Sequence, residues 1–239
     1  MRVLNPYLLN NLKKGLIAEW LFNGDGNPSI GTAVVTYGAG NGFVTGGLQG
    51  MQCIRTNTDT AQANRQIVIP ASSDIVFRDP ITNVQSPFTV ELWFKTTWTL
   101  ATSKRMFGSR PMNTQVDGSF EITFADNTSV TWAVNKGSGN VTQSVITGLP
   151  ALNDGQWHQL VFNFDPATNS TRLYVDAVVS TTNTSASGGT PILPNTGAAI
   201  GLNNFSPTYY AGQQSFAHWS ITRIWKDRIL TASEVNYLY

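Results

Sequence analysis

The sequence predicts an all-β protein: an antiparallel sandwich of two sheets with short helices near the two ends of the chain. Short segments of alternating apolar and polar residues recur about every ten residues, as in β-sandwiches. Helix signals occur only near the ends of the chain. The 239 residues are 41% hydrophobic and 11% aromatic, enough for a sizeable core. Sandwiches of this length commonly fold as one domain, and we expect one here.

The clearest strand signal lies at residues 88–95, where apolar residues occupy every second position. Such alternation places one set on the core face of a sheet and the other set on the opposite face. Residues 157–164 and 171–176 predict a hairpin around the turn formers of 165–170. Further strands are expected at 16–22, 66–69, 105–108, 119–124, 129–135, 198–202 and 217–225.

Two short helices are expected. Thr231 and Glu234 have the spacing of a capping box that opens a helix through Tyr237. Before the domain at 15–239 lies an N-terminal arm, residues 1–14, which carries the apolar residues Leu4, Tyr7, Leu8 and Leu12. A hydrophobic arm must be covered, either by its own sandwich or by a neighbouring subunit, and the sequence leaves both open. These residues are therefore candidates for an assembly contact.

Composition excludes several classes of function. The formal net charge is +1 and only 12% of residues are charged, so no nucleic-acid footprint is expected. The single cysteine, Cys53, excludes an intrachain disulfide and a Cys-rich metal site. No apolar run approaches the ~20 residues of a membrane-spanning helix. The first residues lack the pattern of a signal peptide, which predicts folding in the cytoplasm with no membrane partner.

Six parts of the chain, in order, resemble the laminin G-like, concanavalin A-like jelly rolls. The most specific part is Asp154-Gly155-Gln156-Trp157-His158-Gln159-Leu160, followed by 172–176. The resemblance implies two curved antiparallel sheets in a jelly roll. Members of this family bind glycans or proteins, sometimes through calcium, and a distinct branch hydrolyses glycans. The other matching parts are 15–22, 66–73, 88–95, 199–201, and 222–225 with 230–235.

The resemblance does not extend to catalytic residues. Hydrolytic relatives carry Glu-x-Asp-x-x-Glu on one strand, and none of the four glutamates here lies in that pattern. Glu19 and Glu91 lie on different predicted strands and are able to converge, although structural hydrogen bonds also explain them. His158 is expected to be a hydrogen-bonded strand residue. The sequence therefore predicts no enzyme, with a concanavalin A-like glycoside hydrolase as the alternative.

Calcium is the remaining cofactor to consider, because the family sometimes binds it. A hard cation needs several oxygen ligands. Asp25, Asp59 and Asp176 are the candidate ligands, although turn formation also explains aspartates at such positions. Ser220 stands where laminin G-like chains often carry an aspartate. We expect no cofactor, with calcium as the open alternative.

A glycan surface needs aromatic faces beside amide or carboxylate oxygens. The loop at 203–214 has this mixture. Trp20, Trp93, Trp157 and Trp225 are instead expected to fill the core. The candidate glycan-binding residues are Phe205, Tyr209, Tyr210, Gln213, Trp98, Trp132 and Trp219.

These observations predict a non-catalytic adhesion or assembly module. The apparent lack of a signal peptide suits a phage virion surface protein, either a capsid decoration or a tail or fibre component. Its expected partners are virion or other protein surfaces, possible glycans, and further copies of the chain in a homo-oligomer or larger assembly. A stand-alone soluble lectin is the second alternative, beside the hydrolase.

Overall fold

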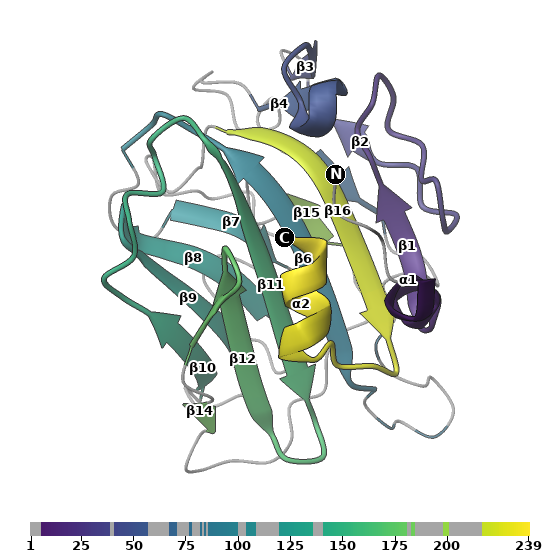
Figure 1. Ribbon diagram of the computed structural model, residues 1–239, viewed down its shortest axis with the longest axis vertical. Coiled ribbons are helices and arrows are strands. Elements are labelled where there is room, and N and C mark those ends of the chain that lie inside the picture. Colours follow the sequence, from purple (N-terminus) through teal and green to yellow (C-terminus); the bar gives the residue numbers. More distant parts are fainter. Residues whose placement is uncertain are drawn as a thin grey trace.

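The computed structural model describes residues 6–38, 41–56, 67–70, 77, 82, 84, 86–99, 104–108, 120–135, 141–180, 183–184, 198–200 and 217–239. These residues form two antiparallel sheets and two short helices, arranged as a sandwich (Figure 1). The predicted all-β sandwich is confirmed. No helix in the described ranges is long and apolar enough to span a bilayer.

The first sheet has nine strands. They are β1 (Leu16–Trp20), β3 (Gly42–Val44), β4 (Cys53–Arg55), β6 (Phe88–Lys95), β11 (Trp157–Asp165), β12 (Ser170–Val175), β13 (Val178–Val179), β14 (Asn183–Thr184) and β16 (His218–Lys226). Their order is β13-β12-β11-β6-β16-β4-β3, with β1 also paired to β16 and β14 to β12. Strand β16 thus lies in the middle of the sheet, beside β6.

The second sheet has seven strands. They are β2 (Thr36–Tyr37), β5 (Ile67–Ile69), β7 (Lys104–Gly108), β8 (Phe120–Asp126), β9 (Ser129–Asn135), β10 (Val141–Ile146) and β15 (Ala198–Ile200), in the order β10-β9-β8-β7-β15-β5-β2. A short 3₁₀ turn, η1 (Leu48–Gly50), separates β3 from β4.

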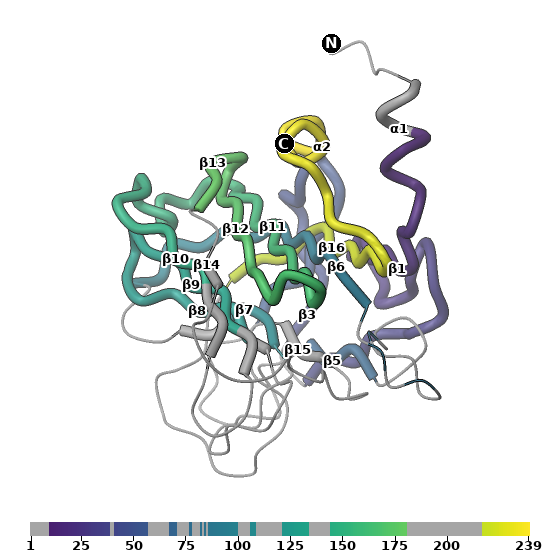
Figure 2. The backbone as a smooth tube through the Cα atoms, turned by 90° about the horizontal axis from the view of Figure 1, so that it is seen from below, coloured from purple at the N-terminus to yellow at the C-terminus, as the bar shows by residue number. Residues whose placement is uncertain are grey.

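The core lies between the two sheets. On β6 the alternating apolar residues Phe88, Val90, Leu92 and Phe94 are all completely buried in it. The opposite face of β6 is also buried at Thr89, Glu91 and Trp93. The reason is that α2 (Ala232–Leu238) lies on the outside of the first sheet (Figure 2). The outer face is therefore a second, smaller packing surface rather than a solvated one.

Both predicted helices form. Thr231 and Glu234 make the reciprocal bonds of a capping box, because the Thr231 side chain accepts from the Glu234 amide and the Glu234 carboxylate accepts from the Thr231 amide. The N-terminal helix is α1 (Pro6–Lys13). Leu12 is 6% exposed and packs in a small cluster on the outer face with Trp225 and Val235.

Of the four apolar arm residues, Leu12 is therefore covered by its own sandwich. Leu4 and the side chains of Tyr7 and Leu8 lie outside the described residues.

Candidate functional site

Glu19 and Glu91, which the sequence left as a possible catalytic pair, meet at one arginine. The register of β1, β16 and β6 places Glu19, Arg223 and Glu91 side by side across three strands. Arg223 Nε donates to Glu19 Oε2 at 2.5 Å, and Arg223 Nη1 donates to Glu91 Oε2 at 3.0 Å. The guanidinium therefore bridges both carboxylates.

Glu91 is completely buried, and both of its carboxylate oxygens accept hydrogen bonds. Its Oε1 accepts from Trp93 Nε1 at 2.8 Å and from Gln159 Nε2 at 2.7 Å. A completely buried carboxylate whose two oxygens are both taken up by donors within the protein has no access to a substrate. This arrangement makes Glu91 the centre of a structural network.

Glu19 is held in a similar way, nearer the surface. Burial alone would raise the pKa of its carboxyl, but the hydrogen bonds from Ser29 and Arg223 and the charge of Arg223 outweigh burial and lower that pKa. Ser29 Oγ lies 2.6 Å from Glu19 Oε1. Glu19 is therefore poorly suited to act as an acid that gives up a proton near neutral pH.

His158 is bound on both ring nitrogens. Its Nδ1 lies 2.6 Å from Asp176 Oδ2, and its Nε2 lies 3.1 Å from Asp154 Oδ1. Burial acts to lower the pKa of His158, but the hydrogen bonds and charges of Asp176 and Asp154 outweigh it and raise that pKa. Both nitrogens donate only in the charged imidazolium, so this geometry favours the protonated ring. His158 thus links the start of β11 to the turn after β12.

The candidate calcium ligands do not come together in the described part of the chain. Asp25 Oδ1 accepts from the Asn27 amide at 3.0 Å, which is a turn contact. Asp176 is bound to His158 and to the Gln159 amide, and Asp59 lies outside the described residues. Within the described ranges, no group of three or more His, Cys, Asp or Glu residues is placed to hold a metal ion.

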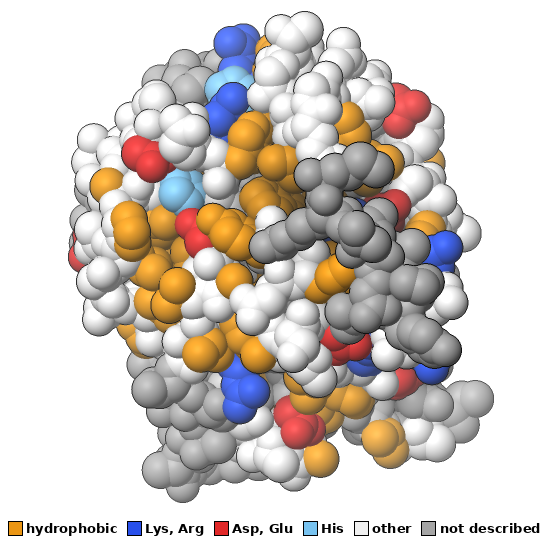
Figure 3. All heavy atoms as spheres, viewed as in Figure 1, with side chains coloured by type: hydrophobic (Ala, Val, Ile, Leu, Met, Phe, Trp, Pro, Cys, Tyr) orange, Lys and Arg blue, Asp and Glu red, His pale blue; other side chains and the backbone are white. Residues whose placement is uncertain are grey.

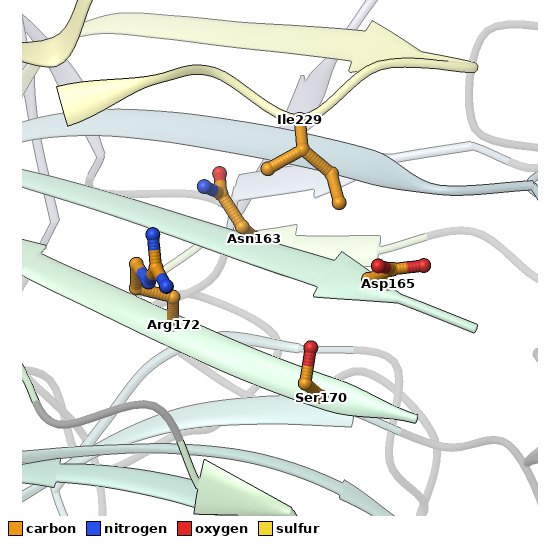
Figure 4. A pocket seen from close by; sticks show the side chains of 5 residues that line it. All are labelled: Asn163, Asp165, Ser170, Arg172 and Ile229. Carbon is orange, nitrogen blue, oxygen red and sulfur yellow. The ribbon is translucent and has the colours of Figure 1, made fainter. Parts of the chain in front are cut away.

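A shallow pocket of about 190 Å³ lies on the outer face where β11 ends and β12 begins (Figure 4). Its Asp165 accepts from the Ala167 amide at 2.9 Å and from Thr168 Oγ1 at 2.8 Å, so this carboxylate shapes the turn. The exposed Arg172 side chain lies on the next strand. The pocket is lined by Asn163, Asp165, Ser170, Arg172 and Ile229.

Asn163 in this pocket holds the C-terminal segment onto the sheet. Its Nδ2 donates to the Leu230 carbonyl at 3.1 Å, and its Oδ1 accepts from Thr89 Oγ1 at 2.8 Å. The Thr89 hydroxyl in turn accepts from the Leu230 amide at 3.1 Å. The amide of Asn163 is thus committed to structure, which leaves the pocket with few groups for a ligand.

The opposite end of the same face carries a different set of side chains. Trp157, Lys95, His218 and Arg55 lie side by side in register on β11, β6, β16 and β4. We name these four residues the basic-aromatic row. Lys95 Nζ lies 5.0 Å from the centre of the Trp157 ring and donates to the Gly46 carbonyl at 3.1 Å. Basic and histidine side chains gather visibly over this end of the sheet, beside β4 (Figure 3).

The basic-aromatic row borders a small hollow of about 80 Å³, lined by Lys95, Thr96, Thr97, Gly155 and His218. Burial, followed by the positive charge of Lys95, lowers the pKa of His218, and the charge of Arg55 acts in the same direction. A hydrogen bond with the Lys95 backbone opposes this shift but does not cancel it. The row therefore places a lysine and an arginine beside a histidine whose lowered pKa keeps it neutral at pH 7.

The predicted glycan-binding residues differ in exposure: one is exposed, two are buried in the core, and four lie outside the described residues. Trp98 is 39% exposed. Trp132 and Trp219, predicted for the same surface, are instead core residues with 0% and 1% exposure, so their rings have no face for a sugar. Alternating strand patterns do not tell a core tryptophan from a surface one. Phe205, Tyr209, Tyr210 and Gln213 lie outside the described residues.

Of the tryptophans assigned to the core, Trp20, Trp93 and Trp225 are buried as expected. Trp157 is only partly buried, because it lies at the end of β11 beside Lys95. The basic-aromatic row itself was not predicted. Its four members are far apart in sequence, and no local pattern joins them.

The family model described as the concanavalin A-like lectin/glucanases superfamily matches residues 70–236. No curated protein matches the chain.

Several solved structures have the same fold. The binding domain of botulinum neurotoxin serotype G matches with a TM-score of 0.69 at 16% identity, over 94% of this chain and 50% of that one. The binding domain of botulinum neurotoxin DC, in complex with rat synaptotagmin II, matches with a TM-score of 0.66 at 10% identity, over 94% and 51%. The chain thus spans about half the length of these toxin domains.

A third similar structure is matched over nearly its whole length. It is domain 4 of AbnA, a GH43 extracellular arabinanase from Geobacillus stearothermophilus, in complex with arabinotriose. The TM-score is 0.57 at 19% identity, over 93% of this chain and 97% of that one. Identities this low indicate a shared fold and do not identify a shared ligand.

Proposed function

The chain belongs to the concanavalin A-like lectin/glucanases superfamily, and we propose that it is a non-catalytic binding module for glycans or protein surfaces. The observation that carries this proposal is the bridging of Glu19 and Glu91 by Arg223. A glycoside hydrolase needs one carboxyl group able to donate a proton and a second able to reach the sugar or its water. Glu91 is buried and Glu19 is held ionised, so this pair does not meet that need.

The similar structures support a binding role through what was bound to them. One similar structure is a toxin binding domain in complex with rat synaptotagmin II, of which this chain matches about half, and the other is an arabinanase domain in complex with arabinotriose. For this chain we propose glycan contact through the exposed Trp98 together with Phe205, Tyr209, Tyr210 and Gln213.

Glycan-array binding tests the glycan proposal. We expect the intact chain to bind a defined group of glycans, and Tyr209→Ala and Tyr210→Ala to reduce that binding severalfold. Trp98→Ala should act in the same direction. Tyr37→Ala is the matched control, because Tyr37 is 43% exposed but lies on β2 of the other sheet. Unchanged binding in all three test variants would overturn the assignment of these residues.

The absence of catalysis is tested separately by the release of reducing sugar from a panel of polysaccharides. We expect no release above that of a heat-denatured sample. Release that disappears in Glu91→Gln, with the variant still folded by circular dichroism, would establish the hydrolase alternative instead.

We further propose that the chain acts on a virion surface, as a capsid decoration or as a tail or fibre component, and in several copies. A charged share of only 12% suits extensive packing against other proteins.

The arm residues Leu4, Tyr7 and Leu8 are the proposed contacts with a neighbouring copy. In light scattering, Tyr7→Ala with Leu8→Ala should lower the mass in solution, and Leu12→Ala should destabilise the fold without that change. An unchanged mass would refute the role of the arm in assembly. If mass spectrometry of purified virions does not detect the protein, the proposal that it acts on a virion surface is wrong.

A further inference from the structure

The basic-aromatic row has the features of a site for an acidic sugar. We propose that Lys95, His218 and Arg55 bind the carboxylate of an acidic saccharide whose ring lies toward Trp157 and Trp98. This inference rests on the proposed binding function and narrows the class of ligand.

The first support is uncompensated positive charge. Lys95 and Arg55 flank His218 on neighbouring strands, and both lie close enough to act on its pKa. No ion pair joins Lys95 or Arg55 to an acidic side chain that the structure describes. Two cations on adjacent strands attract an anion more strongly than either does alone.

The second support is the size of the adjoining hollow. The hollow of about 80 Å³ is large enough for a carboxylate group. Thr97, which is exposed, and Lys95 are among its lining residues, and their hydroxyl and ammonium groups are hydrogen-bond donors suited to carboxylate oxygens. The rest of a longer ligand would lie on the surface outside the hollow.

The third support is the aromatic surface beside the charges. Trp157 is partly buried with Lys95 near its ring, and Trp98 follows Thr97 in the chain with 39% exposure. The Trp98 amide donates to Thr96 Oγ1 at 3.0 Å, which ties this residue to the edge of the hollow. Aromatic rings beside a carboxylate site favour a sugar over an inorganic anion or an acidic peptide.

The position of His218 adds a dependence on pH. Burial lowers the pKa of His218 most, and the charges of Lys95 on β6 and Arg55 on β4, the charged groups that act on it, lower that pKa further. A bound carboxylate favours the protonated ring, so binding takes up a proton. The affinity for a carboxylated sugar should therefore rise as the pH falls below about 6.5, the ordinary pKa of histidine.

The experiment compares ligands that differ only in charge, by isothermal titration calorimetry with the intact chain. The probes are trigalacturonate and its methyl ester, then 3′-sialyllactose and the methyl ester of its carboxyl group. We expect at least one acid to bind more tightly than its uncharged partner, and more tightly at pH 5.5 than at pH 7.5. His218→Gln should remove the pH dependence but not the binding.

Charge variants locate the site. Lys95→Gln and Arg55→Gln should each weaken acid binding about two- to fivefold, as expected for exposed charge pairs, and the double variant about tenfold. Lys226→Gln is the matched control, because it removes one charge at the far end of β16 and should leave binding unchanged. Folding of each variant is checked by circular dichroism.

Equal affinity for acids and uncharged partners would overturn this inference and leave the proposed glycan function intact. Acid binding that survives the double variant would place the site elsewhere. Binding of polyglutamate but of no acidic sugar would identify the row as a protein contact, which also overturns the inference. If neither acid binds, the inference is wrong, and the glycan array then decides the proposed function independently.

Discussion

Arg223 and Glu91 face each other in register across β16 and β6, and their side chains are joined by a hydrogen bond of 3.0 Å. Glu19 on β1 completes the row from the other side of Arg223. Strands β1, β16 and β6 are therefore joined by side chains as well as by their backbone ladders. Removing one partner of such a pair leaves a charge without its counterion in a poorly solvated place.

The first prediction concerns this row. Glu91→Gln should lower the free energy of unfolding by about 3 kcal/mol, because it removes one of the two carboxylates that compensate Arg223. Urea denaturation followed by tryptophan fluorescence measures the change. Asp227→Asn is the control, since it also removes one carboxylate but at an exposed position after β16. Equal effects of the two substitutions would contradict a structural role for the row.

The second prediction concerns His158 and pH. The pKa of His158 is raised in the folded protein, so the folded state binds the proton more tightly than the unfolded chain does. Its contribution to stability should be fully present below about pH 6.5 and lost as the pH rises through the folded-state pKa. Unfolding free energies of the wild type and His158→Gln, measured from pH 5.5 to 8.5, give this contribution as their difference.

His218 provides an internal contrast. Its pKa is lowered, so the folded state binds the proton less tightly, and its contribution should rise with pH up to about 6.5. His158→Gln and His218→Gln should therefore change the slope of stability against pH in opposite directions. Slopes that change in the same direction would show that one of the two environments is wrongly described.

The third prediction concerns the attachment of the C-terminal segment. Thr89→Val keeps the shape of the side chain but leaves the Leu230 amide and Asn163 Oδ1 without the hydroxyl that they bond. We expect a loss of about 1–3 kcal/mol in the free energy of unfolding and faster hydrogen exchange at the Leu230 amide. Thr36→Val, at an exposed position on β2, should produce neither effect.

The fourth prediction tests the capping box of α2. Thr231→Ala removes the side chain that caps the Glu234 amide, and it should cost about 1 kcal/mol in the free energy of unfolding. The exposed Ser233→Ala lies within the helix and serves as the control, with little expected change. A cost no greater than that of the control would mean that α2 gains nothing from this cap.

Local signals in the sequence predicted the regular elements well. Strand β6 has the expected bounds, and β11 and β12 pair around the expected loop, because strict alternation and turn residues act over a few positions. The capping box predicted the start of α2 for the same reason. Strand β10 at 141–146 was missed, since polar residues interrupt its alternation. The strands of two or three residues β2, β3, β4, β13 and β14 were also missed, because they are too short for a periodic pattern.

Such local signals do not predict contacts between strands that are far apart in the sequence. The row of Glu19, Arg223 and Glu91 depends on the relative register of β1, β16 and β6, and its members Glu19 and Arg223 are 204 residues apart in the sequence. The basic-aromatic row depends on register in the same way. The burial of Trp132 and Trp219 follows from how the two sheets face each other, which single strand patterns do not contain.

The place of β16 also bears on how the chain is made. Residues 218–226 lie between β6 on one side and β1 and β4 on the other, yet a ribosome synthesises them after every other strand described here. Until they emerge, β1 has no partner in this sheet and β6 has one bare side, and such edges are prone to join other chains. Completion of this sheet should therefore wait for the synthesis of β16, and chaperone assistance should matter most in the interval before β16 is inserted.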